Sequence, residues 1–211
     1  MVHEQHTPSG HDLFPLTRER IAERLARPAP PPDAHDLHVI ALAEGTRVTE
    51  AAVLVPLVNR SGRLQVLFTQ RTPHLDDHAS QISFPGGRVE AADAGREETA
   101  LRETEEEIGI PRARVTLLGK LPDYEIPSGF RIVPVVGWIE PPFELKPDPF
   151  EVAEVFEAPL EHFLDPGSYQ RREYRLRGRH RHYMAVPYAG RYIWGATAGM
   201  LYNLCRMLRA G

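Results

Sequence analysis

The sequence predicts a domain of the mixed α/β class. Runs rich in β-branched and aromatic residues recur between residues 51 and 195, and turn residues separate them. Two segments with helical periodicity, residues 97–108 and 196–210, interrupt and follow these runs. The chain has 211 residues, of which 42% are hydrophobic and 26% are charged, enough for one domain with its own core. Strands interleaved with a few helices indicate a mixed α/β sheet domain.

Composition narrows the classes of partner and the compartment. The formal net charge is −4 with no basic excess, so we do not expect a nucleic-acid ligand. The single cysteine, Cys205, rules out an internal disulfide and fits a reducing compartment. Residues 1–14 lack the basic start and apolar run of a signal peptide, and no stretch approaches the ~20 apolar residues of a membrane span. We expect a cytoplasmic protein without a membrane partner.

The N-terminal part predicts a helix followed by a spacer. Ile21 and Leu25 mark the apolar face of the helix in "TRERIAERLARP", and the proline block at residues 28–32 ends it. We interpret this block as a semi-rigid spacer, and the alternative of a PxxP ligand motif is less favoured. The predicted organisation is therefore an N-terminal helix with a proline-rich linker over residues 1–34 and the main domain over residues 35–211.

The next segments predict a hairpin, a loop and a helix. Residues 51–58 and 63–70 read as two strands joined by the turn "NRSG". Residues 83–95 are expected to form a loop, because Pro85, Gly86 and Gly87 break regular structure. Residues 97–108, "EETALRETEEEI", predict a strong helix that ends at Gly109.

The second half predicts strands and a closing helix. Strands are expected at residues 114–122 and 130–139, and a strand followed by a short helix at residues 151–164. Further strands are expected within residues 172–178 and 181–195. Residues 196–210 predict the closing helix, and four apolar residues lie on one of its faces: Met200, Leu201, Leu204 and Leu208.

The helix at residues 97–108 carries an unusual concentration of acid. Helical spacing places Glu103, Glu106 and Glu107 on one face and directs Glu105 elsewhere. Like charges at this spacing destabilise a helix, and the dipole near its C-terminus adds to the cost. One interpretation is a solvated helix face. The other is a binding site for a hard divalent cation such as Mg²⁺, which prefers oxygen ligands.

The stretch "FPGGRVEAADAGREETALRETEEEIGI" favours the cation, because it resembles the signature of the Nudix hydrolases, G-x5-E-x7-R-E-U-x-E-E-x-G-U, in which U is aliphatic. The matching residues are Gly87, Arg102, Glu103, Glu106, Glu107, Gly109 and Ile110. The sequence departs from the signature at Thr104, at Asp93 in place of glutamate, and by one extra residue between Asp93 and Arg102. The resemblance implies a Nudix fold, with a mixed sheet between helices (α/β/α), and Mg²⁺ or Mn²⁺ as cofactor.

The resemblance also implies roles for the motif residues. Glu103, Glu106 and Glu107 are the expected metal ligands, and Arg102 is expected to hold a neighbouring carboxylate in place. Glu106 is one candidate for the general base. Glu151 and Glu154 are others, because Nudix enzymes often draw a further acid from a later loop. A surface carboxylate is the alternative for both.

A second resemblance concerns the substrate. Residues 67–87, "LFTQRTPHLDDHASQISFPGG", are similar to the extension L-L-T-x-R-[SA]-x3-R-x3-G-x3-F-P-G-G of the coenzyme A pyrophosphatases in this family. Asp76 and Ser80 depart from it, at an arginine and a glycine position, and Arg131 is a candidate to compensate. The resemblance implies hydrolysis of coenzyme A or its thioesters, with substrate contacts from Arg71, Phe84, Gly86 and Gly87. A salt bridge at the end of a strand is the alternative for Arg71, and Arg131 is the further candidate for a substrate contact.

Two alternatives stay open. The substrate is otherwise another nucleoside diphosphate derivative, such as ADP-ribose or a dinucleotide. A Nudix-fold binding module without catalysis is disfavoured, because all three glutamates are present. A homodimer is expected from the resemblance alone.

Overall fold

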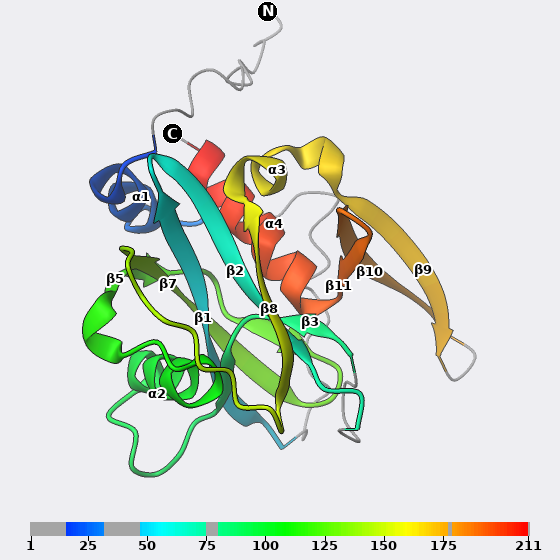
Figure 1. The fold of residues 1–211 in the computed structure, drawn as a ribbon. Helices are drawn as coiled ribbons and strands as arrows, with labels where there is room; N and C mark the ends of the chain where they lie inside the picture. The colour runs from blue at the N-terminus through cyan, green and yellow to red at the C-terminus, as the bar shows by residue number, and fades with distance from the viewer. Residues whose placement is uncertain (1–15, 32–46, 75–79, 177–178, 211) are drawn as a thin grey trace, which may run out of the picture.

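The fold is known from a computed structural model that describes residues 16–31, 47–74, 80–176 and 179–210. Within these ranges the chain forms a mixed eight-stranded sheet and a separate three-stranded sheet, together with four α-helices (Figure 1). The prediction for Asp76 and most of the prediction for residues 1–34 concern residues outside these ranges, so the division of the chain at residue 34 stays a prediction.

The predicted hairpin forms the centre of the large sheet. Strand β1, Thr49–Arg60, pairs antiparallel with β2, Arg63–Arg71, and the register places Arg60 opposite Arg63. Ser61 and Gly62 both have positive φ, 53° and 84°, as the tight turn between twisted strands requires. Three longer partners extend the sheet: β7 (Phe130–Ile139) parallel to β1, β5 (Val115–Lys120) beside β7, and β8 (Val152–Pro159) beside β2.

Three short strands complete the large sheet, and the sequence analysis did not predict them. Strand β3, Ile82–Ser83, pairs with β2, and β6, Tyr124–Ile126, pairs with β7. The prediction that residues 83–95 form only a loop is wrong at one point, because Gly86–Arg88 forms strand β4 on β1. The small sheet has the order β11–β10–β9, with bounds Gln170–Leu176 for β9, Arg179–Tyr188 for β10 and Arg191–Trp194 for β11.

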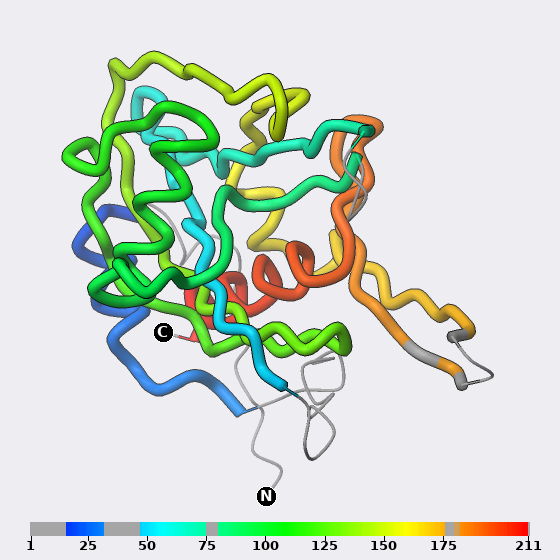
Figure 2. Tube along the Cα trace, turned by 90° about the horizontal axis from the view of Figure 1, so that it is seen from below, coloured from blue at the N-terminus to red at the C-terminus, as the bar shows by residue number. Residues whose placement is uncertain are grey.

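Helices cover both faces of the large sheet, which confirms the α/β/α prediction. Helix α2, Arg96–Ile108, lies on one face, and α4, Ala196–Arg209, lies on the other (Figures 1 and 2). Helices α1, Arg18–Leu25, and α3, Leu160–Leu164, join α4 in the larger core cluster. The β9–β10 hairpin extends away from this body in both views.

The continuous apolar run of β1 follows from this two-sided cover, because successive side chains of a strand point to opposite faces. Ala52 and Leu54 pack with Ala100 of α2. Val55 and Leu57 lie in the cluster that contains Leu204 of α4. Strand β7 divides in the same way, with Val133 and Val135 on the α2 side and Val136 and Trp138 on the α4 side.

The N-terminal helix is part of this core. Ile21 is fully buried, and Leu25 lies where a Cβ on Gly119 of β5 would collide with it. The following proline block runs along α4, because the Arg206 guanidinium donates to the carbonyl oxygen of Pro30 at 2.9 Å. The described part of the block thus contacts the domain, and its interpretation as a spacer stays a prediction. In the described part of the chain, no helix is long and apolar enough to cross a membrane.

Candidate metal and diphosphate site

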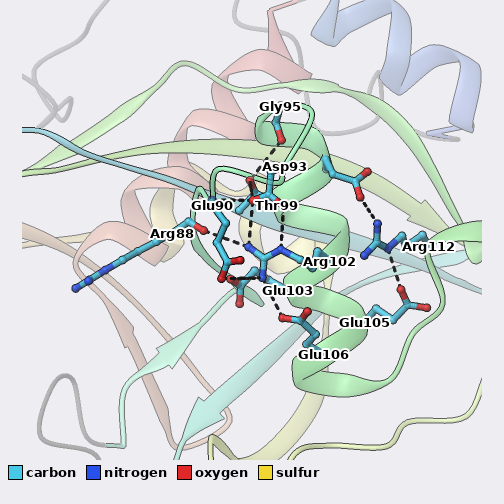
Figure 3. Close-up of polar contacts among 11 residues, drawn as sticks. Arg88, Glu90, Asp93, Gly95, Thr99, Arg102, Glu103, Glu105, Glu106 and Arg112 are labelled. Atoms are coloured by element: carbon cyan, nitrogen blue, oxygen red, sulfur yellow. Dashed lines mark hydrogen bonds and ion pairs between the residues drawn. The ribbon is translucent and has the colours of Figure 1, made fainter.

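The acidic side chains on one face of α2 differ in how deeply they are buried. The helix ends at Gly109, whose φ of 74° is left-handed, as the sequence predicted. Glu107 is only 6% exposed, whereas the side chain of Glu106 is 60% exposed. Glu103 lies between these extremes, and Glu105 points to the other side of the helix, where it accepts a hydrogen bond from Arg112 (Figure 3). The three predicted ligands thus share a side but differ in depth.

Arg102 joins the helix to the loop that precedes it. Figure 3 shows its guanidinium between Asp93 of the loop and two glutamates of the helix. Nε and Nη2 donate to the two carboxylate oxygens of Asp93 at 2.9 and 3.1 Å. Nη1 donates to Glu103 at 2.9 Å and to Glu106 at 3.0 Å. The predicted contact of Arg102 with a neighbouring carboxylate is therefore present, and the pair with Asp93 is bidentate.

Asp93 is held by more than this one partner. Its side chain is only 3% exposed, and it also accepts hydrogen bonds from the Thr99 hydroxyl and from the backbone N–H of Glu90. The Arg102 hydrogen bond, followed by the Glu90 and Thr99 hydrogen bonds, holds the pKa of Asp93 well below its usual range. The shorter aspartate therefore serves where the Nudix signature has glutamate, as an anchor for the loop.

Two glycines bring the loop backbone up to the acidic face. Gly86 has φ 155°, and a Cβ there would collide with the backbone of β1 at Ala52 and Val53. A Cβ on Gly87 would collide with the carboxylate of Glu103. The loop backbone in strand β4 therefore passes directly against the carboxylate of Glu103.

Glu107 is a buried carboxyl next to two other acids. Burial raises its pKa to about 8, with further contributions from the negative charges of Glu103 and Glu151. The positive charge of Arg71 and a hydrogen bond from the Gly86 N–H act in the opposite direction. Burial likewise raises the pKa of Glu103, against the effect of Arg102. A positive charge placed between these carboxylates would remove the repulsion.

Arg71 lies at the end of β2, next to an irregularity in its register with β8. Its Nε atom is buried and has no hydrogen-bond partner among the residues that the structure describes. A buried donor without a partner is costly, so this atom is suited to an incoming acceptor. A phosphate oxygen fits, because a guanidinium matches phosphate geometry and the charge of Arg71 acts on Glu107.

The donor set fits a hard divalent cation. Glu103 and Glu107 offer carboxylate oxygens one helical turn apart, and Gly87 leaves their approach open. Among the residues that the structure describes, no three His, Cys, Asp or Glu side chains already surround one ion position. The carboxylates of Glu103 and Glu106 both accept a hydrogen bond from Nη1 of Arg102. Ions such as Mg²⁺ keep several waters, so two carboxylates suffice to hold one.

Of the other predicted site residues, one lies beside the acidic face of α2 and two pair with other residues. The charge of Glu151 acts on both Glu103 and Glu107, which places it beside the site. Glu154 makes a two-pronged ion pair with Arg191 at 2.6 and 2.8 Å, so its carboxylate is occupied. Arg131 is likewise occupied, by Glu125 and Glu50.

Phe84 and Ser80 belong to the framework of the loop. Phe84 is buried and stacks on Phe68 with ring centroids 5.4 Å apart, so its position supports the Pro85–Gly87 turn and leaves no face for a ligand. Ser80 has φ 59°, a conformation that glycine adopts more readily. The departure from glycine noted in the sequence therefore falls where the backbone is left-handed.

Several residues that the sequence did not indicate fix the end of α2 and the segment that contains Glu151. The N–H groups of Lys146 and Asp148 donate to the carbonyl oxygens of Ile108 and Glu107, at the end of α2. Thr72 donates through its N–H to the Glu151 carbonyl and through its hydroxyl to the Phe150 carbonyl. No local sequence motif predicts these contacts, because they join segments that are distant in the sequence.

Comparison with known proteins identifies the family of the chain. The sequence model of the NUDIX domain matches residues 48–180. A protein of Citrobacter koseri described as "Uncharacterized Nudix hydrolase NudL" is 42% identical over 155 residues, which are 74% of this chain and 80% of that protein. The protein of the same description from Escherichia coli K12 is 41% identical over equal shares. The crystal structure of a Caenorhabditis elegans Ap4A hydrolase binary complex aligns at 23% identity with a TM-score of 0.45, covering 54% of this chain and 82% of that one.

The chain therefore belongs to the Nudix hydrolase family, whose members act on diphosphate bonds and generally use divalent metals such as Mg²⁺ or Mn²⁺.

The Asp93 anchor predicts a specific acid sensitivity. The pKa of Asp93 is lowered on folding, so its contribution to stability is complete above the ordinary value of 3.8 and is lost as the pH falls below it. We expect Asp93→Asn to lower the urea midpoint at pH 7 and to weaken the fall in stability between pH 5 and pH 3. An unchanged midpoint at pH 7 would show that the anchor does not stabilise the loop.

The raised pKa of Glu107 predicts that Mg²⁺ stabilises the protein more at high pH. Without metal, the raised pKa contributes stability that is complete below pH 4.5 and is lost as the pH rises through about 8. Below that value Mg²⁺ must displace a proton, which lowers its affinity by about tenfold per pH unit. Differential scanning fluorimetry should therefore show a larger Mg²⁺-induced rise in Tm at pH 8.5 than at pH 6.5.

Two variants separate the site from the rest of the helix. Glu107→Gln should abolish most of the Mg²⁺-induced rise at both pH values. Glu105→Gln removes an equal charge from the side of the helix that faces Arg112, and it should behave like the unmodified protein. Equal responses of the two variants would contradict a metal site on the Glu103–Glu107 side.

Proposed function

We propose that this protein is a Mg²⁺- or Mn²⁺-dependent diphosphatase that hydrolyses coenzyme A or its thioesters to 3′,5′-ADP and 4′-phosphopantetheine products. The observation that carries the proposal is that acidic side chains and an arginine lie close together around Glu107. The charges of Glu103, Glu151 and Arg71 all act on the buried carboxyl of Glu107, and the Nε of Arg71 has no partner in the described part of the chain. Carboxylates for a cation and a guanidinium for a phosphate are together what a metal–diphosphate complex requires.

In this proposal Glu103 and Glu107 would hold the cation, and Glu106 would join them. Glu103 and Glu106 share Nη1 of Arg102, so each would bind the cation through an oxygen that does not accept from Arg102. When bound, the metal supplies Lewis-acid stabilisation of the phosphate oxygens and lowers the pKa of a coordinated water. Arg71 binds and orients a phosphate oxygen. Gly86 and Gly87 allow the diphosphate to approach the backbone of β4.

Glu151 is the general base that the geometry favours. It lies beside Glu103 and Glu107 without a side-chain partner among the contacts found in the described chain, and its backbone is fixed by Thr72. Glu154 is occupied by Arg191, and Glu106 by Arg102. Glu151 would take the proton of the attacking water as that oxygen bonds to phosphorus and the bridging oxygen leaves.

The coenzyme A assignment rests on the motif around Arg71, which the similarity to coenzyme A pyrophosphatases covers. The alternative substrate is ADP-ribose or a dinucleotide, and one observation favours keeping it. Arg131, the residue that would compensate for the missing arginine at position 76, already pairs with Glu125 and Glu50. Recognition of the 3′-phosphate therefore needs this pair to open. A cytoplasmic, homodimeric enzyme is part of the same proposal.

A substrate panel tests the proposal. Coenzyme A, dephospho-coenzyme A, ADP-ribose and NADH are each incubated with the protein and Mg²⁺, and products are separated by chromatography. We expect the highest kcat/KM with coenzyme A. Equal or better turnover of ADP-ribose would replace coenzyme A by the alternative, and failure to hydrolyse any of the four would overturn the diphosphatase itself.

The same assay measures the role of the acidic face. Glu107→Gln should lower kcat by roughly a hundredfold or more, because it removes a charge that holds the cation in the transition state. Glu105→Gln is the matched control and should keep its activity. Circular dichroism confirms that both variants keep the fold.

A further inference from the structure

Beside the acids lies an exposed phenyl ring that none of the roles above uses. Phe150 is 64% exposed, the largest exposed fraction among the large hydrophobic side chains that the structure describes. It directly precedes Glu151, whose charge acts on Glu103 and Glu107. An isolated exposed Phe is unremarkable on a protein surface, so its position is what needs explanation.

The backbone around Phe150 is fixed to both sides of the site. Its N–H donates to the Asp148 carboxylate at 2.8 Å, and its carbonyl accepts from the Thr72 hydroxyl at 2.8 Å. Asp148 is in turn tied to the carbonyl of Glu107, and Thr72 directly follows Arg71. The backbone that carries the ring is therefore tied to the end of α2 at Glu107 and to the residue that follows Arg71.

One neighbour supports the ring and leaves most of it free. The imidazole of His74 lies with its centroid 5.0 Å from that of Phe150, at an interplanar angle of 59°. The same histidine is 3.5 Å from the Thr72 hydroxyl, so it belongs to the segment that follows Arg71. Two rings inclined to each other at the edge of a charged site form a surface for a flat, partly apolar group.

We propose that Phe150, supported by His74, is the surface on which the heteroaromatic base of a nucleoside diphosphate substrate stacks. The inference rests on the proposed function, because that function supplies a substrate whose diphosphate lies between the acids and Arg71. A base linked to that diphosphate through a ribose has to leave the charged centre, and Phe150 offers it an aromatic face at the rim. Stacking favours an aromatic base over a saturated chain because both partners present flat π-faces.

Inhibition by two compounds of equal charge tests this inference. ADP and methyl diphosphate carry the same diphosphate group and differ by the nucleoside. We expect Phe150→Ala to weaken inhibition by ADP by about fivefold or more and to leave inhibition by methyl diphosphate within about twofold of the unmodified protein. The KM for the best nucleotide substrate should rise while kcat is kept, because stacking contributes equally to substrate and transition state.

Further variants distinguish a base from an apolar arm. Phe150→Trp should retain the affinity for ADP, and Phe150→Leu should lose it as Phe150→Ala does. If Phe150→Leu bound ADP as tightly as the unmodified protein, position 150 would contact an apolar chain, and the inference would be overturned. Tyr174→Ala, at an exposed aromatic residue of β9, is the control and should change neither inhibitor.

The outcomes separate this inference from the proposed function. An active enzyme in which Phe150→Ala matches the unmodified protein with ADP would overturn the stacking surface and leave the diphosphatase standing. A protein without diphosphatase activity on any substrate would overturn both.

Discussion

The structure depends on keeping several carboxylates close together on one side of a single helix. Glu107 is buried next to Glu103 and within the influence of Glu151, an arrangement that electrostatics opposes. Arg102 offsets part of this repulsion from the solvent side, and Arg71 offsets part of it from the sheet. The surrounding contacts hold this arrangement, which is unfavourable by itself and which a bound cation would stabilise.

The scaffold holds the acids by backbone contacts at both ends of the helix. At its start, the Asp93 anchor and strand β4 fix the glycine turn against Glu103. At its end, the segment that contains Asp148 satisfies the free carbonyl groups of α2, which a helix C-terminus would otherwise leave open. The same segment carries Phe150 and Glu151. The hydrogen bonds of Asp148 and Thr72 therefore fix the end of α2, the backbone of Glu151 and the backbone of Phe150 together.

Most of the fold and the centre of the site could be predicted from the sequence, because these features depend on residues that are close together in the chain. The β1–β2 turn, the stop of α2 at Gly109 and the apolar face of α4 each depend on residues within a few positions of one another. The one-sided glutamates followed from helical spacing. What depends on long-range contacts was not predictable: the short strands β3, β4 and β6, the packing of α1 into the core, and the occupation of Arg131 and Glu154 by distant partners. Phe150 could not be recognised in the sequence for the same reason, because the Thr72 hydroxyl that ties its backbone to the site is distant in the chain.

The central claim is that the acidic side of α2 binds a divalent cation. Anomalous diffraction from crystals grown with Mn²⁺ measures this most directly, because the metal is then located without reference to activity. The account predicts a Mn²⁺ peak coordinated by the carboxylates of Glu103 and Glu107, within reach of Arg71 through a bound phosphate. Manganese bound only elsewhere, with Glu107 still enclosed as a neutral acid, would contradict it.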